Sequence, residues 1–116
     1  MNQRLKREFD RLNHLHWDGQ LLEIEIIGSR ALDGLLGEYH CPDYPDMDHP
    51  DEYRIFIDIT QPRAIQVSTL LHEMCHHSVF LANKDAYYAN RLQWHGRKWK
   101  AEMKRVGFKG KITQYT

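Results

Sequence analysis

The chain has 116 residues, of which 41% are hydrophobic and 28% charged, with sixteen basic and sixteen acidic residues. These values are ordinary for one globular domain over residues 1–116. No apolar run approaches the roughly 20 residues of a transmembrane helix, so the sequence excludes a membrane-spanning protein. The charge is uneven: residues 18–58 hold eleven acidic and two basic residues, whereas residues 84–116 hold nine basic and two acidic ones. The basic third could attract DNA, or it could pair with the acidic segment within the fold.

The first residues and the cysteines predict the cellular compartment. The opening sequence MNQRLKREFDRL is charged and amphipathic, and it lacks the continuous apolar segment of a secretory signal. Two cysteines, Cys41 and Cys75, do not make a disulfide framework and cannot form a four-cysteine zinc site. We therefore expect a cytoplasmic protein with reduced thiols.

Hydrophobic spacing predicts a helix at the start of the chain, followed by two short strands. Apolar residues recur at helical spacing between charged ones. They are Leu5, Phe9, Leu12 and either Leu15 or His16. The sequence WDG at residues 17–19 ends this helix. Apolar and acidic residues alternate over residues 22–26, which predicts a half-buried strand that Gly28 ends. A second strand is predicted over residues 35–40, where Gly37 would permit a bend or close packing.

Residues 41–52, CPDYPDMDHPDE, are predicted to form a loop, because three prolines and five acidic residues disfavour both a helix and a central strand. This loop is either a solvated connection or a flap that borders the active site, and we interpret His49 within it as a surface histidine. A third strand is predicted over residues 53–59. One face carries Tyr53, Ile55, Ile57 and Ile59, and the other carries Arg54, Phe56 and Asp58.

A long helix is predicted over residues 62–81. Thr60 is a possible N-cap, and Pro62 lies close to the first turn, where its missing N–H does no harm. Apolar residues occupy more than one side of this helix, which is typical of a helix covered on several faces. We therefore expect it to be the central helix of the fold.

The sequence LLHEMCHHSVF, residues 70–80, lies on this helix and contains an H-E-x-x-H motif. His72 and His76 are four residues apart, so they share one face and can offer two imidazole nitrogens to a single metal ion. Glu73 lies about 100° around the helix from His72, beside such an ion, where it could accept a proton from an attacking water. The alternative is a solvated pair of histidines on an ordinary helix.

The last part of the chain is predicted to contain a break at residues 83–85, a polar connection and a final helix. In this helix Trp99, Met103 and Val106 point inward, Lys100 and Lys104 point outward, and Gly107 ends it. His95, just before the helix, is the candidate for a third zinc ligand, because a catalytic zinc usually has three protein ligands and leaves its fourth position to water. The alternative is that His95 only caps the helix.

The sequence resembles the SprT-like metalloprotease family, which includes bacterial SprT proteins and the protease domain of Spartan. The similarity rests on WDG at residues 17–19, LGEY at residues 36–39, the strand that leads into the H-E-x-x-H helix, and HGRKW at residues 95–99. It covers nearly the whole chain. The resemblance implies a zincin-like α+β fold with an N-terminal helix, a small three-stranded, mainly antiparallel sheet, a central H-E-x-x-H helix and a C-terminal helix.

The resemblance also implies a site and an activity. His72, His76 and His95 are expected to bind Zn²⁺, and Glu73 is expected to be the general base that later protonates the leaving amine. We expect a zinc endopeptidase whose extended polypeptide substrate adds to a strand edge, such as that of residues 53–59, and whose targets include DNA-associated proteins. The alternative is a zinc-stabilised protein- or DNA-binding module without turnover.

Two features depart from the family pattern. Many relatives continue into a small zinc ribbon, and we expect a minimal form of the domain without it. The residue after the second zinc histidine is usually small in relatives, but here it is His77, which we expect on the helix surface or in contact with the ligands rather than on the metal. Cys75 is expected to be a small packing residue. Tyr87 or Tyr88 could stabilise an oxyanion, or both could pack or face solvent.

Overall fold

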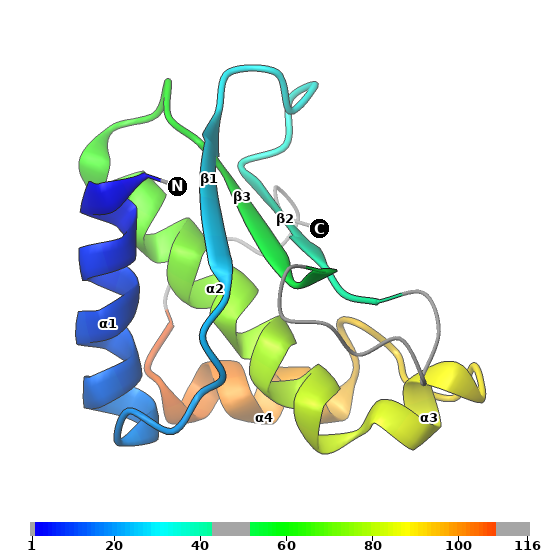
Figure 1. Ribbon diagram of the computed structural model, residues 1–116. Coiled ribbons are helices and arrows are strands. Elements are labelled where there is room, and N and C mark those ends of the chain that lie inside the picture. The colour runs from blue at the N-terminus through cyan, green and yellow to red at the C-terminus, as the bar shows by residue number, and fades with distance from the viewer. Residues whose placement is uncertain (1, 43–51, 109–116) are drawn as a thin grey trace.

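The computed structural model describes residues 2–42 and 52–108, so the predicted loop over residues 41–52, with His49, falls almost entirely outside the described residues. The described residues form four helices and three strands, which confirms the predicted α+β fold with an N-terminal helix (Figure 1). In chain order these elements are α1 (Gln3–Trp17), β1 (Glu25–Ser29), β2 (Gly37–His40), β3 (Arg54–Asp58), α2 (Arg63–Ala82), α3 (Lys84–Tyr88) and α4 (Arg97–Arg105). None of these helices is both long and apolar enough to cross a bilayer.

The first helix, α1, follows the predicted spacing closely. Its inward residues Leu5, Phe9 and Leu12 are at most 4% exposed, whereas Leu15 is 62% exposed and does not extend the apolar stripe. Each fully buried side chain of this kind contributes about 1.5–3 kcal/mol to stability. The helix ends where the WDG sequence predicts, because Asp18 adopts a left-handed conformation with a φ of 52° and caps the last turn.

The sheet has one antiparallel and one parallel pair, so the expectation of mainly antiparallel pairing holds for β2 and β3 alone. The strand order is β1-β3-β2, with β1 parallel to β3 and β2 antiparallel to β3. The third strand thus lies between the first two. β3 is therefore paired along both edges, and the expectation that a substrate adds to the strand of residues 53–59 is wrong. The outer edge of β2 pairs with no described strand.

The first strand lies three residues later than predicted, and Gly28, expected to end it, lies inside it. The reason is a close contact between neighbouring segments: a Cβ atom on Gly28 would lie 2.6 Å from Cγ2 of Ile59. Glycine is thus needed for packing within the strand rather than for a turn after it. The predicted alternation in β3 is confirmed, because Ile55 and Ile57 are fully buried and Arg54 is exposed.

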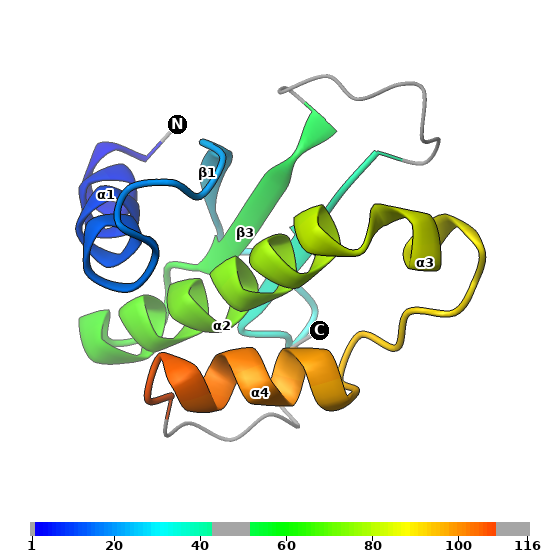
Figure 2. The ribbon, with the colours of Figure 1, turned by 90° about the horizontal axis from the view of Figure 1, so that it is seen from below.

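The long helix α2 is central, as predicted. Figure 2 shows it between the sheet on one side and α4 on the other. Two hydrophobic cores meet it: one is shared with the sheet and α1, and the second lies between α2 and α4. The second core consists of Cys75, Val79, Trp99, Met103 and Val106. A helix with a core on each side can hold polar side chains in fixed rotamers between them.

Two local predictions around α2 are wrong. Thr60 does not cap the helix, because its N–H and hydroxyl bond to the carboxylate of Asp58, and the cap position is taken by Pro62 without a side-chain hydrogen bond. The connection after α2 is not irregular throughout, since Lys84–Tyr88 form the short helix α3. Five residues are too few for a helical period to be visible in a sequence.

Candidate metal centre

Three histidine side chains from two parts of the chain converge beside α2. His72 and His76 lie one turn apart on this helix and are at most 2% exposed, and His95 comes from the loop before α4. One nitrogen from each of these residues lies within 4.8 Å of the others, so a single metal ion could contact all three. The structure thus brings together the three residues that the sequence predicted as ligands.

The indole of Trp99 packs against all three histidines and closes one side of the site, which we call its floor. Its ring stacks on His76, with centroids 5.1 Å apart, and meets His72 and His95 edge-on at 4.9 and 4.6 Å. Trp99 is fully buried on α4. A packed aromatic ring in contact with all three imidazoles restricts their rotamers, which is what a metal site needs from the residues around its ligands.

The donor set fits a zinc ion. Three imidazoles with no thiol or carboxylate among them form a known set of ligands for catalytic zinc. His95 adds a second observation: its Nε2 atom is buried and has no hydrogen-bond partner among the described residues. A buried polar nitrogen without a partner costs about 1–3 kcal/mol, and a bound metal would remove that cost. His95 also does not cap α4, because the cap residue is Gly96 and no side chain caps that end.

Glu73 lies next to the histidines and directly under the edge strand β2. Its side chain is fully buried. A Cβ atom on Gly37 of β2 would lie 3.2 Å from Oε2 of Glu73 and 2.6 Å from Cγ2 of Thr69. The predicted close packing at Gly37 is therefore confirmed, and it lets the backbone of β2 approach the carboxylate.

His77 is not on the helix surface, where one of the two predictions put it, but is fully buried between α2 and the sheet. Its Nε2 lies 2.9 Å from the carbonyl oxygen of Leu22, and its Nδ1 lies 2.7 Å from the hydroxyl of Tyr39. A carbonyl only accepts, so Nε2 donates to Leu22 and Nδ1 accepts from Tyr39. Burial lowers the pKa of His77 to about 4, against the opposing effect of its bond to Leu22, so the ring is neutral at pH 7.

A sequence signal for the burial of His77 exists. Leu70, Met74, His77 and Phe80 recur at spacings of four, three and three residues, which places them on one helix face. All four are buried against the sheet side of α2. Cys75 lies in the second core, as expected of a packing residue, and burial raises the pKa of its thiol.

The two tyrosines of α3 belong to an aromatic cluster. The Tyr88 hydroxyl donates to the carbonyl of Pro42 at 2.7 Å, and the Tyr87 ring meets those of Phe80 and Trp94 at 5.1 and 5.3 Å. This arrangement favours packing, the second of the two alternatives for these residues. Trp94 in turn meets His76 at 5.3 Å, so the cluster extends to the histidines.

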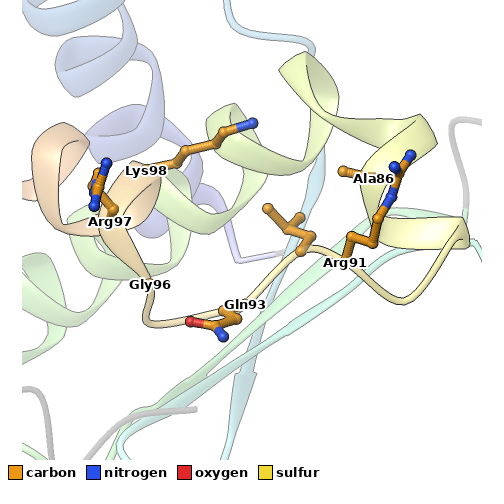
Figure 3. Close-up of a pocket in the computed structure, with 7 residues that line it drawn as sticks. Ala86, Arg91, Gln93, Gly96, Arg97 and Lys98 are labelled. Carbon is orange, nitrogen blue, oxygen red and sulfur yellow. The ribbon is translucent and has the colours of Figure 1, made fainter.

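A basic hollow of about 270 Å³ lies between the end of α3 and the start of α4 (Figure 3). Arg91, Arg97 and Lys98 line it, and all three are exposed. Neither arginine side chain has an ion-pair partner among the described residues, whereas Lys98 donates to the side chain of Asn83 at 2.5 Å. In the described part of the chain, the basic residues of α4 make one ion pair, between Arg105 and Glu102 of the same helix. Among the described residues, α4 therefore makes no ion pair with the acidic segment, which was the predicted alternative.

Comparison with known proteins assigns the family. The model of the SprT-like family matches residues 5–116, which include every described helix and strand after the first two residues of α1. No curated protein and no solved structure matches the chain. Domains of this family are metalloprotease-related, in agreement with three histidines converging beside a buried glutamate. The chain belongs to the SprT-like family.

Proposed function

We propose that this protein is a zinc-dependent endopeptidase that hydrolyses peptide bonds in an extended polypeptide. The observation that carries the proposal is the convergence of His72, His76 and His95 within 4.8 Å, with the buried Glu73 beside them. Family membership supports it, because the match extends over residues 5–116. We expect this activity in the cytoplasm, where thiols stay reduced.

Each residue has a role in this reaction. His72, His76 and His95 would hold a zinc ion, which would supply a Lewis acid for the scissile carbonyl. Glu73 accepts a proton from the attacking water and returns it to the leaving amine. Its buried position under β2, next to His72 in the chain, supports this role, because a general base must be held near the group whose proton it accepts. Trp99 excludes water from one side of the site.

The edge strand β2 is the place where an extended substrate would bind. It is an edge strand of the described sheet, and extended polypeptides add to edge strands through backbone hydrogen bonds. Gly37 of β2 lies over Glu73, so a polypeptide paired with β2 would pass close to the carboxylate.

The substitution Glu73→Gln tests the activity. We expect the variant to keep one zinc per chain by metal analysis and to cleave an unfolded protein at least about 100-fold more slowly, because it removes the base and leaves the ligands. The control is Glu23→Gln, which changes a 72% exposed carboxylate paired with Lys6 and should cleave at the wild-type rate. Cleavage by Glu73→Gln at the wild-type rate would refute the mechanism. One zinc per chain without cleavage by the wild type would favour a zinc-stabilised binding module instead.

The basic hollow supports a second element of the proposal, which is action on DNA-associated proteins. Two exposed arginines without a described ion-pair partner, Arg91 and Arg97, could each contact a phosphate group. We expect binding to DNA that weakens as salt rises, and a loss of at least about tenfold in affinity when both are changed to Glu. Arg30→Glu, in the loop between β1 and β2, is the control. No retention of the wild type on DNA at low salt would remove this element and leave the peptidase proposal intact.

A further inference from the structure

Two of the contacts between the edge strand β2 and the histidine-bearing helix α2 lie two residues apart on the strand. Gly37 lies over Glu73 and Thr69, and the Tyr39 hydroxyl bonds to His77 at 2.7 Å. Residues two apart in a strand point to the same face and are about 6.8 Å apart, and residues four apart on a helix are about 6.0 Å apart. The step from Gly37 to Tyr39 therefore matches the step from Glu73 to His77. Both contacts therefore form together in this register.

His77 is itself held at both ring nitrogens. While Nδ1 accepts from Tyr39, Nε2 donates to the carbonyl of Leu22, in the segment just before β1, at 2.9 Å. The ring cannot rotate without losing both bonds in a fully buried place. The rings of Tyr53 and Phe80 enclose the pair further, at 5.2 Å from His77 and 6.3 Å from Tyr39. The hydroxyl of Tyr39 thus has a fixed partner.

The same tyrosine also reaches the loop that carries the third histidine. Its ring meets Trp94 edge-on at 5.9 Å, and Trp94 precedes His95 and meets His76 at 5.3 Å. A shift of Tyr39 would therefore change the position of β2 relative to both parts of the chain that supply the histidines.

We propose that Tyr39 and His77 are positioning residues that set the register of β2 against the metal centre, and through β2 the position of the bound polypeptide. This inference rests on the proposed peptidase function. A substrate paired with the outer edge of β2 takes its position from that strand, and a displacement of about 1 Å can cost about 100-fold in rate. A core contact alone would stabilise the fold without affecting where the substrate lies.

Tyr39→Phe tests the proposal, because it removes one hydroxyl and keeps the ring. We expect amide exchange in β2 to become about fivefold faster, as expected for one lost hydrogen bond, with no change in the middle of α2. We expect kcat/KM to fall about tenfold for a long extended peptide, and to change less than twofold for a short peptide that cannot pair along β2. Zinc content should stay at the wild-type value.

Ser78→Ala is the matched control. It removes a hydroxyl from the neighbour of His77, but that hydroxyl bonds to Glu102 and Trp17 on the other side of α2. This variant should lose stability without changing exchange in β2 or the ratio of the two kcat/KM values. Unchanged exchange and an unchanged ratio in Tyr39→Phe would overturn the proposal, as would equal losses in both variants. If the wild type cleaves nothing, the proposed function and the substrate part of this inference fall together, and exchange alone decides whether Tyr39 fixes β2.

Discussion

The two sides of α2 hold the candidate site by different interactions. On the side of α4, the fully buried indole of Trp99 packs against all three histidines. The other residues of this second core are apolar. On the side of the sheet, Glu73 lies under the backbone of β2, and His77 is hydrogen-bonded to two other segments. If the proposed function holds, metal binding should depend mainly on packing, whereas the positions of Glu73 and of a bound polypeptide should depend on backbone approach and hydrogen bonds. Substitutions on the two sides should separate these properties.

The largest effect is expected from Trp99→Ala, which breaks the α4 side. Removing a fully buried indole should cost about 3–5 kcal/mol in the free energy of unfolding and should lower zinc affinity, because the three imidazoles lose their common contact. Chemical denaturation and zinc titration measure these two effects. Trp99→Phe keeps part of the floor and should lie between the wild type and the alanine variant. Zinc affinity that is unchanged in a folded Trp99→Ala would contradict a role for packing in holding the ligands.

Removal of the metal should have the next largest effect. Zinc at about 100 times its dissociation constant should stabilise the fold by about 2.7 kcal/mol, which a chelator removes. His95→Ala should lose most of this zinc-dependent stabilisation, whereas His14→Ala, at an exposed position of α1, should keep it. Thermal unfolding with and without zinc measures the difference. Equal zinc stabilisation in the wild type and in His95→Ala would exclude His95 as a ligand.

Gly37→Ala should disrupt the packing of β2 against α2 and leave the three histidines in place. The new Cβ atom would lie 2.6 Å from Cγ2 of Thr69 and 2.9 Å from the carbonyl oxygen of Phe56, so β2 must move away from α2, at a cost of about 1–3 kcal/mol. Proteolysis should fall much more than zinc affinity. Adding Thr69→Ser removes the clashing methyl group and should restore part of the stability and activity. A proportional loss of zinc affinity and proteolysis would mean that the two sides are not separable.

The smallest effect is expected from lowering the pH. It concerns Glu102, whose carboxylate accepts hydrogen bonds from Trp17 of α1, Ser78 of α2 and Arg105 of α4. Burial disfavours ionisation of Glu102, but hydrogen bonds from Arg105, Ser78 and Trp17 outweigh it, so its pKa lies below the ordinary value of 4.5. The ionised form stabilises the fold above that value, and this stabilisation is lost as the pH falls through the lower, folded-state pKa. Glu102→Gln should therefore be less stable than the wild type at pH 7, and the difference should shrink between about pH 5 and pH 3. A constant difference in unfolding free energy across this range would contradict the assignment.

Much of the fold and the site could be predicted from local patterns. Spacing was sufficient for α1, the inward residues of α4 and the two histidines of α2, because each depends on neighbours within one helix. The approach of His95 to these histidines could be expected mainly from the resemblance to a family, together with the usual three protein ligands of a catalytic zinc, since nothing local links residues so far apart in the chain. The structure then brought them within reach of one ion.

The predictions that failed depend on contacts between distant segments. The alternation of residues within β3 says which face is buried, but not that the strand enters between β1 and β2. From the sequence, Gly28 is expected to end the first strand, because its packing against Ile59 is visible only in the structure. His77 is polar, so its burial becomes visible only with its partners, Leu22 and Tyr39.

The strand order also affects how the protein folds during synthesis. β1 and β2 have no backbone pairing with each other, so both wait for β3, which is made last. Only residues 59–62 separate β3 from α2, so the arrival of the central strand brings the histidine-bearing helix to the sheet almost at the same moment. A nascent chain that stops before residue 54 would hold two unpaired strands, which are prone to aggregation. Completion of the sheet should therefore bring His72 and His76 into place together, whereas the candidate metal centre is complete only after the segment that carries His95 has been made.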